Sequence, residues 1–479
     1  MSKILFVGAE AMPFAATGGL GDVMGSLPTA IKEADPDSDI RVVMPLYSAV
    51  KDEWRAQMET VASFEVKLAW RRVYCGVKSL VKDGVTYYFI DNEYYFSRKA
   101  LYGEFDDGER YAYFCMAVLE MLDKVGFYPD ILHAHDWQAA LSVVYLNCLF
   151  RWKREYQNIK TVFTIHNIEY QGYYSTSILG DVFGLGHDSL NILEYNGCLN
   201  LMKGAIVCAD IVSTVSPRYA DEIRTSEYSH GLHFIINQNH YKLRGILNGI
   251  DYDYYNPETD KVIAANFSAN DHSGKAVDKK ELQRAIGLPE EENIPVLAII
   301  SRLATHKGLD LVAQMVYNLL ENNNVQLVVL GKGEAGYEEL FRDVERKYPE
   351  KARALIEYDR DLSKRIYAAC DIFIMPSKSE PCGLSQMIAS RYGAIPVVRE
   401  TGGLYDSIKG YWEKDGELMG NGFTFANYSA HELYDRIVAA VNLYNDVEKR
   451  NAFVSKIMNT DFSWNVSAKK YLEMYGSIL

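Results

Sequence analysis

Short runs of aliphatic and β-branched residues alternate with amphipathic helical stretches along most of the chain. In the first half, such runs occupy residues 3–8, 39–44, 131–134, 160–165 and 211–215. In the second half, they occupy residues 295–301, 326–330, 354–358, 372–376 and 395–398. Buried strands separated by helices are typical of βαβ units with parallel sheets. The pattern therefore predicts an α/β protein with two Rossmann-like, doubly wound domains, and we expect them to face each other across a cleft.

One region departs from this pattern. Between residues 64 and 91 apolar and polar positions alternate, and Asp83-Gly84 is a two-residue turn signal, so we expect hairpin strands inserted as a decoration of the first domain. The boundary is expected near Asn248, where tyrosines interrupt the pattern. We place the domains at residues 1–243 and 244–479, and the final helix, after Trp464, is a candidate to pack back on the first domain.

Composition limits the possible partners. A chain of 479 residues, 48% of them hydrophobic, can fill two cores. A net charge of −14 argues against nonspecific binding to nucleic acid, so an anionic substrate would depend on a local basic cluster. The seven cysteines are scattered without CxxC spacing, and no apolar run is long enough to span a bilayer. We expect a cytoplasmic protein with no membrane partner and no structural zinc, and make no prediction of its oligomeric state.

A carboxylate and a glycine follow the apolar run at residues 372–376. Glu380 begins the segment EPCGLSQ, which opens a helical pattern. Ligands bind at the carboxyl ends of strands in open α/β sheets, and the N–H groups at a helix start suit phosphate. A sugar joined to a diphosphate needs both features, because its hydroxyls need an acceptor and its phosphates need donors. The alternative is a solvated loop glutamate.

Basic residues follow the first strand of the second domain. Arg302 offers a planar fork of donors and Lys307 a mobile point charge, so together they can hold a diphosphate and neutralise it as a leaving group. Tyr358 ends another predicted strand, and all three residues open onto the same sheet edge as Glu380. A solvated helix terminus is the alternative for Arg302 and Lys307.

The first domain carries a glycine loop after its first strand and polar residues at the ends of two later strands. Gly18 and Gly19, in the segment TGGLGD, would let backbone N–H groups approach a phosphate, although neither the dinucleotide fingerprint nor a Walker motif is present and a plain tight turn is the alternative. A buried structural role is expected for His133. For Asp136 and His166 a functional and a structural role are equally open, and no second carboxylate supports a metal site.

Together these segments resemble the bacterial glycogen synthase and plant starch synthase family, retaining glucosyltransferases of the two-domain GT-B fold. The resemblance extends over essentially the whole chain and also includes the segments HAHDW at 133–137, TIHN at 164–167, NGID at 248–251 and TGGL at 401–404. It implies a retaining hexosyltransferase that moves glucose from ADP-glucose to the non-reducing 4-hydroxyl of an α-1,4-glucan such as glycogen. No metal and no cofactor are implied.

The resemblance also implies residue roles. Arg302 and Lys307 are expected to bind the diphosphate, Glu380 to bind glucose hydroxyls, and His166 and Asp136 to line the glucose and acceptor site. The expected donor-binding residues are Gly18, Gly19, Asn248, Tyr358 (stacked on adenine), Cys382, Gly383, Leu384 and Ser385. Weaker candidates for the acceptor side are Glu10 and Tyr95.

One position departs from the family pattern. The glycine loop of the family usually contains Lys-x-Gly-Gly-Leu, with the lysine near the donor phosphates, whereas this chain has Ala16 there. The substitution, natural or engineered, puts full donor affinity in doubt. Two alternatives therefore stay open: a glucan-binding protein with an impaired donor site, and a GT-B transferase of other sugar-nucleotide specificity, such as a sucrose or trehalose synthase.

Overall fold

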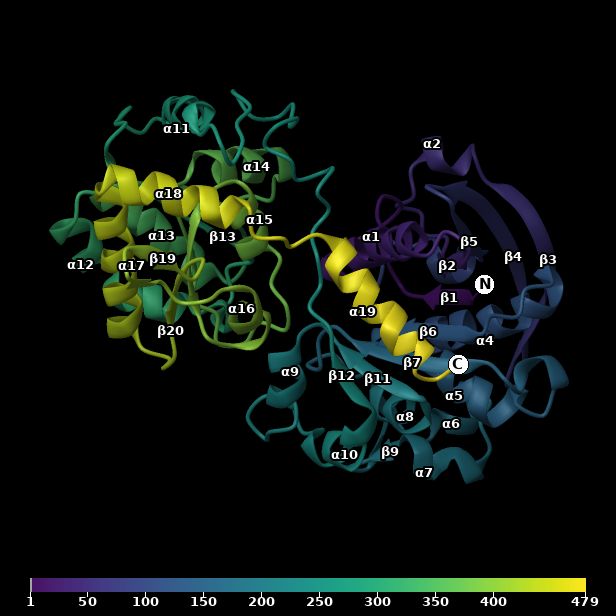
Figure 1. Ribbon diagram of the computed structural model, residues 1–479. Coiled ribbons are helices and arrows are strands. Elements are labelled where there is room, and N and C mark those ends of the chain that lie inside the picture. Colours follow the sequence, from purple (N-terminus) through teal and green to yellow (C-terminus); the bar gives the residue numbers. More distant parts are fainter. Residues whose placement is uncertain (1) are drawn as a thin grey trace. The chain divides into compact units, whose positions relative to one another are not determined.

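The computed structural model describes residues 2–479, which form two compact units (Figure 1). Unit 1 contains the chain up to Asn248 together with Trp464–Leu479, and unit 2 contains Gly249–Ser463. Each unit has an open sheet with helices between successive strands, so the prediction of two doubly wound domains is confirmed. All ten predicted strands are present. The largest boundary shift is at 354–358, where the strand is Ala352–Leu355.

Unit 1 contains a nine-stranded sheet within the described residues. Its order is β12 (Leu243–Gly245), β11 (Ile211–Thr214), β7 (Lys160–Ile165), β6 (Ile131–His135), β1 (Lys3–Val7), β2 (Asp39–Pro45), β5 (Val85–Asp91), β4 (Arg71–Lys82) and β3 (Glu59–Leu68). The strands from β12 to β5 are parallel, whereas β4 and β3 are antiparallel to their neighbours. Residues of the central strand β1 from Ile4 to Val7 are fully buried, which explains why it appears in the sequence as a continuous apolar run.

The region at 64–91 forms the predicted hairpin but is not a separate decoration. Asp83 and Gly84 both have positive φ, 51° and 75°, and close the turn between β4 and β5. β5 pairs in parallel with β2, so β5, β4 and β3 continue the main sheet of unit 1. Alternation along a strand identifies its two faces, but it does not identify the strand's neighbour, and this is why the sequence suggested an insertion.

The helices of unit 1 cover both faces of its sheet. The longer ones are α1 (Gly19–Ala34), α4 (Asp107–Val125), α5 (Asp136–Tyr145), α8 (Leu201–Cys208) and α19 (Trp464–Gly476). The chain moves from β1 to β2 in one direction and from β6 to β7 in the other, so right-handed crossovers put α1 and α5 on opposite faces. The final helix α19 packs beside α1 (Figure 1). The topological switch point of unit 1 therefore lies between β1 and β6.

Shorter elements complete unit 1. They are α2 (Asp52–Arg55), α3 (Glu93–Phe96), α6 (Ile178–Asp181), α7 (Leu190–Leu193), α9 (Pro217–Glu222), α10 (His233–Gln238) and a small sheet of β8 (Tyr173–Ser175), β10 (Cys198–Asn200) and β9 (Glu194–Tyr195). The start of α9 shows why these residues form a helix there, since Ser216 Oγ accepts the Tyr219 N–H and Pro217 occupies the first helical position.

Unit 2 contains a six-stranded parallel sheet within the described residues. Its order is β15 (Ala352–Leu355), β14 (Gln326–Leu330), β13 (Val296–Ile300), β16 (Ile372–Met375), β17 (Ile395–Arg399) and β20 (Phe423–Phe425). The chain first builds outward from β13 to β15 and then returns to β16, on the other side of β13. The switch point of unit 2 therefore lies between β13 and β16, where ligands of open α/β sheets bind.

The helices of unit 2 are α11 (Ser273–Ala285), α12 (Leu309–Asn322), α13 (Ala335–Lys347), α14 (Arg360–Ala369), α15 (Ser385–Arg391), α16 (Gly402–Ser407), α17 (Ala430–Asn445) and α18 (Val447–Met458), and a hairpin is formed by β18 (Trp412–Lys414) and β19 (Glu417–Met419). Across residues 2–479 of both units, no helix combines the length and the apolar character that a membrane crossing requires.

Candidate functional site

Glu380 and Lys307 meet at the switch point of unit 2. Glu380 follows β16 and is only 7% exposed, and Lys307 ends a short 3₁₀ helix, Thr305–Lys307, that precedes α12. Glu380 Oε2 accepts hydrogen bonds from Lys307 Nζ at 2.7 Å and from Ser377 Oγ at 3.0 Å. The structure thus brings together the predicted sugar-binding carboxylate and one predicted phosphate-binding cation.

Glycines hold this arrangement tightly. A Cβ added to Gly308, which has φ 74°, would lie 2.1 Å from the carbonyl oxygen of Pro376, and one added to Gly402, φ 44°, would lie 1.9 Å from the carbonyl oxygen of Glu380. The N–H of Gly403 donates to that same Glu380 carbonyl at 3.1 Å. No role was predicted for these glycines. The Gly402-Gly403 pair, separated by two residues from the end of β17 at Arg399, is the signal that marks the close approach at Glu380.

Arg302 and Tyr358 lie on the same sheet edge, after β13 and β15. Arg302 is exposed and its Nη2 is 3.5 Å from His306 Nε2. Tyr358 is 79% exposed, and its hydroxyl accepts a hydrogen bond from Arg360 Nε at 3.2 Å. Among residues 2–479 neither Arg302 nor Tyr358 hydrogen-bonds Glu380. An exposed ring and an exposed guanidinium at this edge are both available to a ligand.

The turn from Cys382 to Ser385 leads into α15. Gly383 has φ 71°, a conformation that favours glycine, and Cys382 is buried. The Gln386 side chain donates to the carbonyl oxygens of Cys382 at 3.2 Å and Gly383 at 2.8 Å, which fixes the turn. Leu384 precedes the first helical residue, Ser385.

In unit 1, Glu10 organises the glycine loop. Its carboxylate is 1% exposed and accepts hydrogen bonds from the Thr17 N–H at 2.6 Å, the Thr17 hydroxyl at 2.8 Å, the Gly18 N–H at 3.3 Å and the Tyr102 hydroxyl at 2.5 Å. Burial and the Glu10 charge together raise the pKa of Tyr102. The Gly18 N–H therefore points at Glu10, whereas Gly18 and Gly19 are exposed, with no atom within 4 Å of an added Cβ.

Ala16 packs against the first turn of α1. A Cβ on Gly21 would lie 2.2 Å from Ala16 Cβ and 3.3 Å from Glu10 Oε2. A longer side chain at position 16 would therefore start beside the Glu10 carboxylate and the glycine loop. The position that departs from the family pattern lies next to the loop that was expected to meet the donor phosphates.

His166 and Asp136 are brought together at the carboxyl ends of β7 and β6. Asp136 Oδ1 accepts the His166 N–H at 2.7 Å, and Asp136 has a positive φ of 56° where it begins α5. Burial raises the pKa of Asp136 to about 7, although the N–H groups of His166 and Asn167 oppose the shift. Burial lowers the pKa of His166 to about 3, so its imidazole is neutral at physiological pH.

His133 is a buried structural residue, as expected. Its Nδ1 lies 2.8 Å from the Tyr475 hydroxyl on α19, and its Nε2 lies 2.6 Å from the Thr164 hydroxyl. Burial holds the pKa of His133 well below its usual range. A neutral imidazole with both nitrogens bonded ties the last helix of unit 1 to strands β6 and β7.

The remaining unit 1 candidates differ from each other. Asn248 is 5% exposed, and within the described residues its buried Oδ1 has no hydrogen-bond partner, which leaves an acceptor unused. Tyr95 is 2% exposed and donates its hydroxyl hydrogen bond to Glu109 Oε1 at 2.6 Å, while its ring packs on Tyr113. The structure places Tyr95 in the core and does not bring it to the other site residues.

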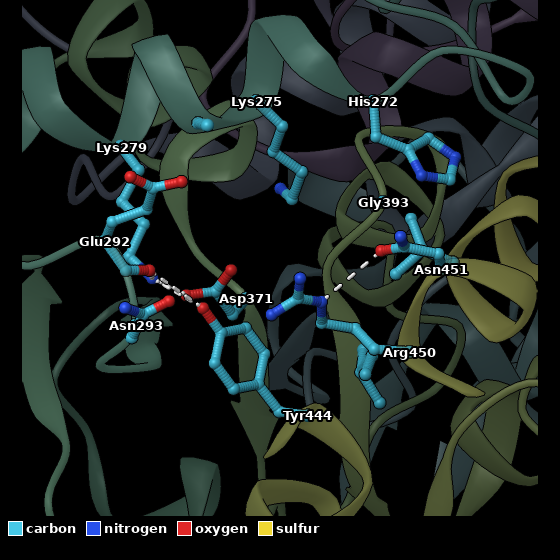
Figure 2. A pocket seen from close by; sticks show the side chains of 13 residues that line it. His272, Lys275, Lys279, Glu292, Asn293, Asp371, Gly393, Tyr444, Arg450 and Asn451 are labelled. Carbon is cyan, nitrogen blue, oxygen red and sulfur yellow. Dashed lines mark hydrogen bonds and ion pairs between the residues drawn. The ribbon is translucent and has the colours of Figure 1, made fainter. Parts of the chain in front are cut away.

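A cavity of about 120 Å³ lies at the opposite edge of the unit 2 sheet (Figure 2). Lys275 Nζ donates there to three carbonyl oxygens, of Tyr367, Ala368 and Tyr392. Lys279 Nζ also has three acceptors, the Asp371 carboxylate, the Tyr444 hydroxyl and the Glu292 carbonyl oxygen. Since an ammonium group has three N–H donors, both lysines are satisfied by the protein. Lys275 fastens α11 to the C-terminal ends of α14 and α15, and Lys279 fastens it to Asp371, directly before β16. Within residues 2–479, no group of three or more His, Cys, Asp or Glu side chains is arranged to hold a metal ion.

Comparisons with known proteins agree with this geometry. Residues 3–238 match the family model described as starch synthase catalytic domain, and residues 278–459 match the model described as glycosyl transferases group 1. The chain is 46% identical over 479 residues to the glycogen synthase of Ligilactobacillus salivarius (strain UCC118) and 45% identical over 480 residues to that of Streptococcus pneumoniae (strain 70585), with all of each chain covered.

Solved structures give the same result. The catalytic domain of starch synthase IV from Arabidopsis thaliana, bound to ADP and acarbose, is 36% identical with a TM-score of 0.90, covering 100% of this chain and 99% of that one. The sucrose-phosphate synthase of Thermosynechococcus elongatus has a TM-score of 0.59 at 14% identity, covers 100% of this chain and 99% of its own, and supports the fold alone. This chain has the GT-B fold and belongs to the glycogen and starch synthase family of glycosyltransferases.

Proposed function

We propose that this protein is a retaining hexosyltransferase that moves glucose from ADP-glucose to the non-reducing 4-hydroxyl of an α-1,4-glucan such as glycogen. The observation that carries the proposal is the Lys307–Glu380 pair, 2.7 Å apart at the switch point of unit 2, in a chain related over its full length to glycogen synthases. The ADP and acarbose bound to the Arabidopsis relative support the choice of donor and acceptor class.

The residues of unit 2 suit the donor. Arg302 and Lys307 would neutralise the diphosphate, and the nearly buried carboxylate of Glu380 would accept hydrogen bonds from glucose hydroxyls. The exposed ring of Tyr358 is available to stack on adenine, a contact that needs no particular base edge. The turn from Cys382 to Ser385 would support the sugar or the phosphates through its backbone.

The reaction retains configuration, because an α-linked donor gives an α-linked product. We propose a front-face substitution in which the bond from glucose C1 to the diphosphate oxygen breaks and the bond from C1 to the acceptor 4-oxygen forms on the same face. The acceptor proton moves to the departing diphosphate oxygen. Stabilisation of that oxygen by Arg302 and Lys307 is then the main contribution to rate.

The residues of unit 1 suit a neutral polyol. His166, with its pKa lowered by burial to about 3, does not transfer protons at neutral pH and would instead orient sugar hydroxyls. Asp136 would accept hydrogen bonds from the glucan or the glucose, and the unused Oδ1 of Asn248 is an acceptor for a donor-sugar hydroxyl.

One alternative is a glucan-binding protein with an impaired donor site. Ala16 favours it, because a family lysine is missing beside the glycine loop. The intact Lys307–Glu380 pair and the exposed Arg302 argue for catalysis, since a pure glucan-binding protein needs neither. The other alternative is a GT-B transferase that uses a different sugar nucleotide. Comparing the rates of glucose transfer from ADP-glucose and from UDP-glucose distinguishes it from the proposed function.

A radiolabel transfer assay tests the proposal. Labelled ADP-glucose and glycogen should give label in precipitable glucan, released by an enzyme specific for α-1,4 links, at a rate well above that with UDP-glucose. Incorporation from UDP-glucose alone would overturn the donor assignment, and glycogen binding without incorporation from any sugar nucleotide would support the binding-protein alternative.

We also propose a cytoplasmic location. All seven cysteines are free, which suits a reducing compartment. Fractionation of cells with an antibody against the protein would test this.

A further inference from the structure

Two imidazoles meet at the carboxyl ends of β6 and β7. His135 Nδ1 lies 2.9 Å from His166 Nε2. His135 is fully buried, whereas His166 is partly exposed. No role was predicted for His135, which stands between two other candidates, His133 and Asp136, in the segment HAHDW.

Both rings are neutral at physiological pH. Burial holds the pKa of His135 well below its usual range and lowers that of His166 to about 3. A neutral imidazole carries one N–H and one lone pair. A hydrogen bond between the two rings therefore needs the N–H on one facing nitrogen and the lone pair on the other.

Only two tautomer pairs satisfy this condition. In one pair, His135 Nδ1–H donates to His166 Nε2, and His166 carries its own proton on Nδ1. In the other pair, His166 Nε2–H donates to His135 Nδ1, and His135 carries its proton on Nε2. The remaining two combinations place two protons or two lone pairs against each other at 2.9 Å.

The environment of His135 Nε2 determines which of the two tautomer pairs is more stable. Within the described residues this nitrogen is buried and has no hydrogen-bond partner. The second pair would put an N–H there with no acceptor, whereas the first pair leaves only a lone pair. Among buried backbone groups, an N–H without a hydrogen-bond partner is rarer than an acceptor without one. A buried polar group without a partner carries a free-energy penalty.

We infer that His135 is a positioning residue that fixes His166 in the tautomer with its proton on Nδ1. His166 thereby presents a permanent donor to its partly exposed side, and the inference, which rests on the proposed function, assigns that donor to a sugar oxygen. A fixed donor distinguishes an oxygen with an available lone pair from a group that can only donate.

The packing around His135 keeps its ring in place. Its ring centroid is 4.1 Å from that of His133, whose ring is tilted relative to it by 32°, and 5.7 Å from that of Phe6, on which it stacks. His133 is itself held at both nitrogens, by Tyr475 and Thr164. His135 therefore cannot turn without disturbing the core between β6 and β1.

Nitrogen NMR of ¹⁵N-histidine-labelled protein without ligand tests the tautomer directly. The resonances of His166 are identified by their loss in His166→Gln. We expect a protonated-type shift at Nδ1 and an unprotonated-type shift at Nε2, unchanged between pH 6 and pH 8. The opposite assignment would overturn the inference. Because no substrate is present, this outcome is independent of whether the proposed activity is correct.

Variants test the positioning role. His135→Leu removes the donor, whereas His135→Asn can place an amide N–H near the position of Nδ1. We expect His135→Leu to mix the His166 tautomers and to lower kcat/KM for ADP-glucose about tenfold, the effect of one hydrogen bond. We expect His135→Asn to restore both the shift and most of the rate.

Tyr475→Phe is the matched control. It removes a buried hydrogen bond from the neighbouring His133 without touching the bond between His135 and His166. We expect it to lower thermal stability and leave the His166 shifts unchanged. Equal tautomer mixing in Tyr475→Phe and His135→Leu would show a general packing effect and overturn the specific role, as would an unchanged His166 tautomer in a folded His135→Leu.

Discussion

The residues that we assign to the reaction are held in different ways in the two units. In unit 2, Arg302 and Tyr358 are exposed, and the Lys307–Glu380 pair joins full charges at a turn between strand and helix. In unit 1, His166 and Asp136 lie in a dense hydrogen-bond network in which burial keeps the imidazoles neutral.

This difference matches two kinds of ligand. A diphosphate carries several negative charges and needs mobile or forked cations that can donate several hydrogen bonds to its oxygens. A glucan is neutral, so it is recognised by fixed donors and acceptors, and these are most selective when a rigid core orients them. In the proposed mechanism the same doubly wound topology would therefore serve an electrostatic function in unit 2 and an orienting function in unit 1.

The largest expected effect comes from the charge of Glu380. Glu380→Gln keeps an acceptor for Lys307 and Ser377 but removes the negative charge proposed to face the sugar. Loss of one preorganised electrostatic contact costs on the order of 10²-fold or more in rate. We expect kcat with ADP-glucose to fall by that amount, while the affinity for ADP, measured by calorimetry, changes little.

The exposed pair between Lys449 and Glu413 is a suitable control for Glu380→Gln. Its N–O distance, 2.8 Å, is almost the same, but both side chains are on the surface of unit 2, 43% and 42% exposed. Glu413→Gln should leave kcat unchanged. Near-normal turnover in Glu380→Gln would remove the basis of the proposed mechanism.

The next effect concerns the glycine loop of unit 1, where a charge is missing. Ala16→Lys restores the family lysine beside Glu10 and Gly21. A charge-assisted hydrogen bond contributes roughly 1.5 to 3 kcal/mol, so kcat/KM for ADP-glucose should rise roughly 10- to 100-fold. The KM for glycogen should scarcely move. Ala16→Met, of similar length but uncharged, separates charge from bulk, and equal donor kinetics in Ala16→Lys and the parent would show that another group already fills this role.

Sequence patterns predicted the parallel strands well, because burial on both faces makes each one a continuous apolar run. The short edge strands β12 and β20, three residues each, were not predicted, since so short a segment has no periodicity. The hairpin region was recognised from its alternation, but its pairing with β2 depends on tertiary contacts that alternation does not encode.

Some site residues were predicted and others were not, because local sequence patterns encode strand ends but not tertiary contacts. Strand-end positions located Arg302, Lys307 and Glu380, because parallel strands all end at one edge. Tyr95 was a weaker acceptor-side candidate from the family resemblance, whereas in the structure its buried hydroxyl donates a hydrogen bond to Glu109. The contact between His135 and His166 joins residues 31 positions apart, and only the pairing of β6 with β7 brings them together.

A smaller effect is expected at the exposed ring of Tyr358. Base stacking on an aromatic side chain is worth about 1 to 3 kcal/mol, and the low end applies to a ring that is 79% exposed. Tyr358→Ala should therefore weaken ADP binding about 5- to 10-fold, measured by calorimetry, with little change in glucan affinity. Tyr358→Phe keeps the ring and should bind ADP normally, so similar losses in both variants would assign the effect to the hydroxyl and its bond from Arg360.

A substitution at Asp136 tests how much its buried negative charge lowers the folding stability of unit 1. Its folded pKa of about 7 lies above the ordinary value of 3.8, mainly because of burial. As pH rises from the ordinary value towards 7, the unfolded state releases the proton first, so the folded state loses relative stability, and above 7 the loss is constant. Asp136→Asn does not titrate and still accepts the His166 N–H. Its melting temperature should exceed the parent's by a few degrees at pH 8 and by less at pH 5, and a gain that is equal at both pH values would contradict the raised pKa.

The smallest expected effect is that of a chelator on the rate. In the proposed reaction the charge of the departing diphosphate is met by Arg302 and Lys307, which do for the leaving group what a divalent cation does in metal-dependent enzymes. Initial rates of glucose transfer should therefore be the same with and without EDTA, and added magnesium or manganese should not raise them. A metal-dependent glycosyltransferase in the same buffer verifies that chelation is complete. If EDTA abolishes transfer and a divalent cation restores it, Arg302 and Lys307 do not carry the charge of the diphosphate, and the electrostatic role assigned to unit 2 would pass from its side chains to a bound ion.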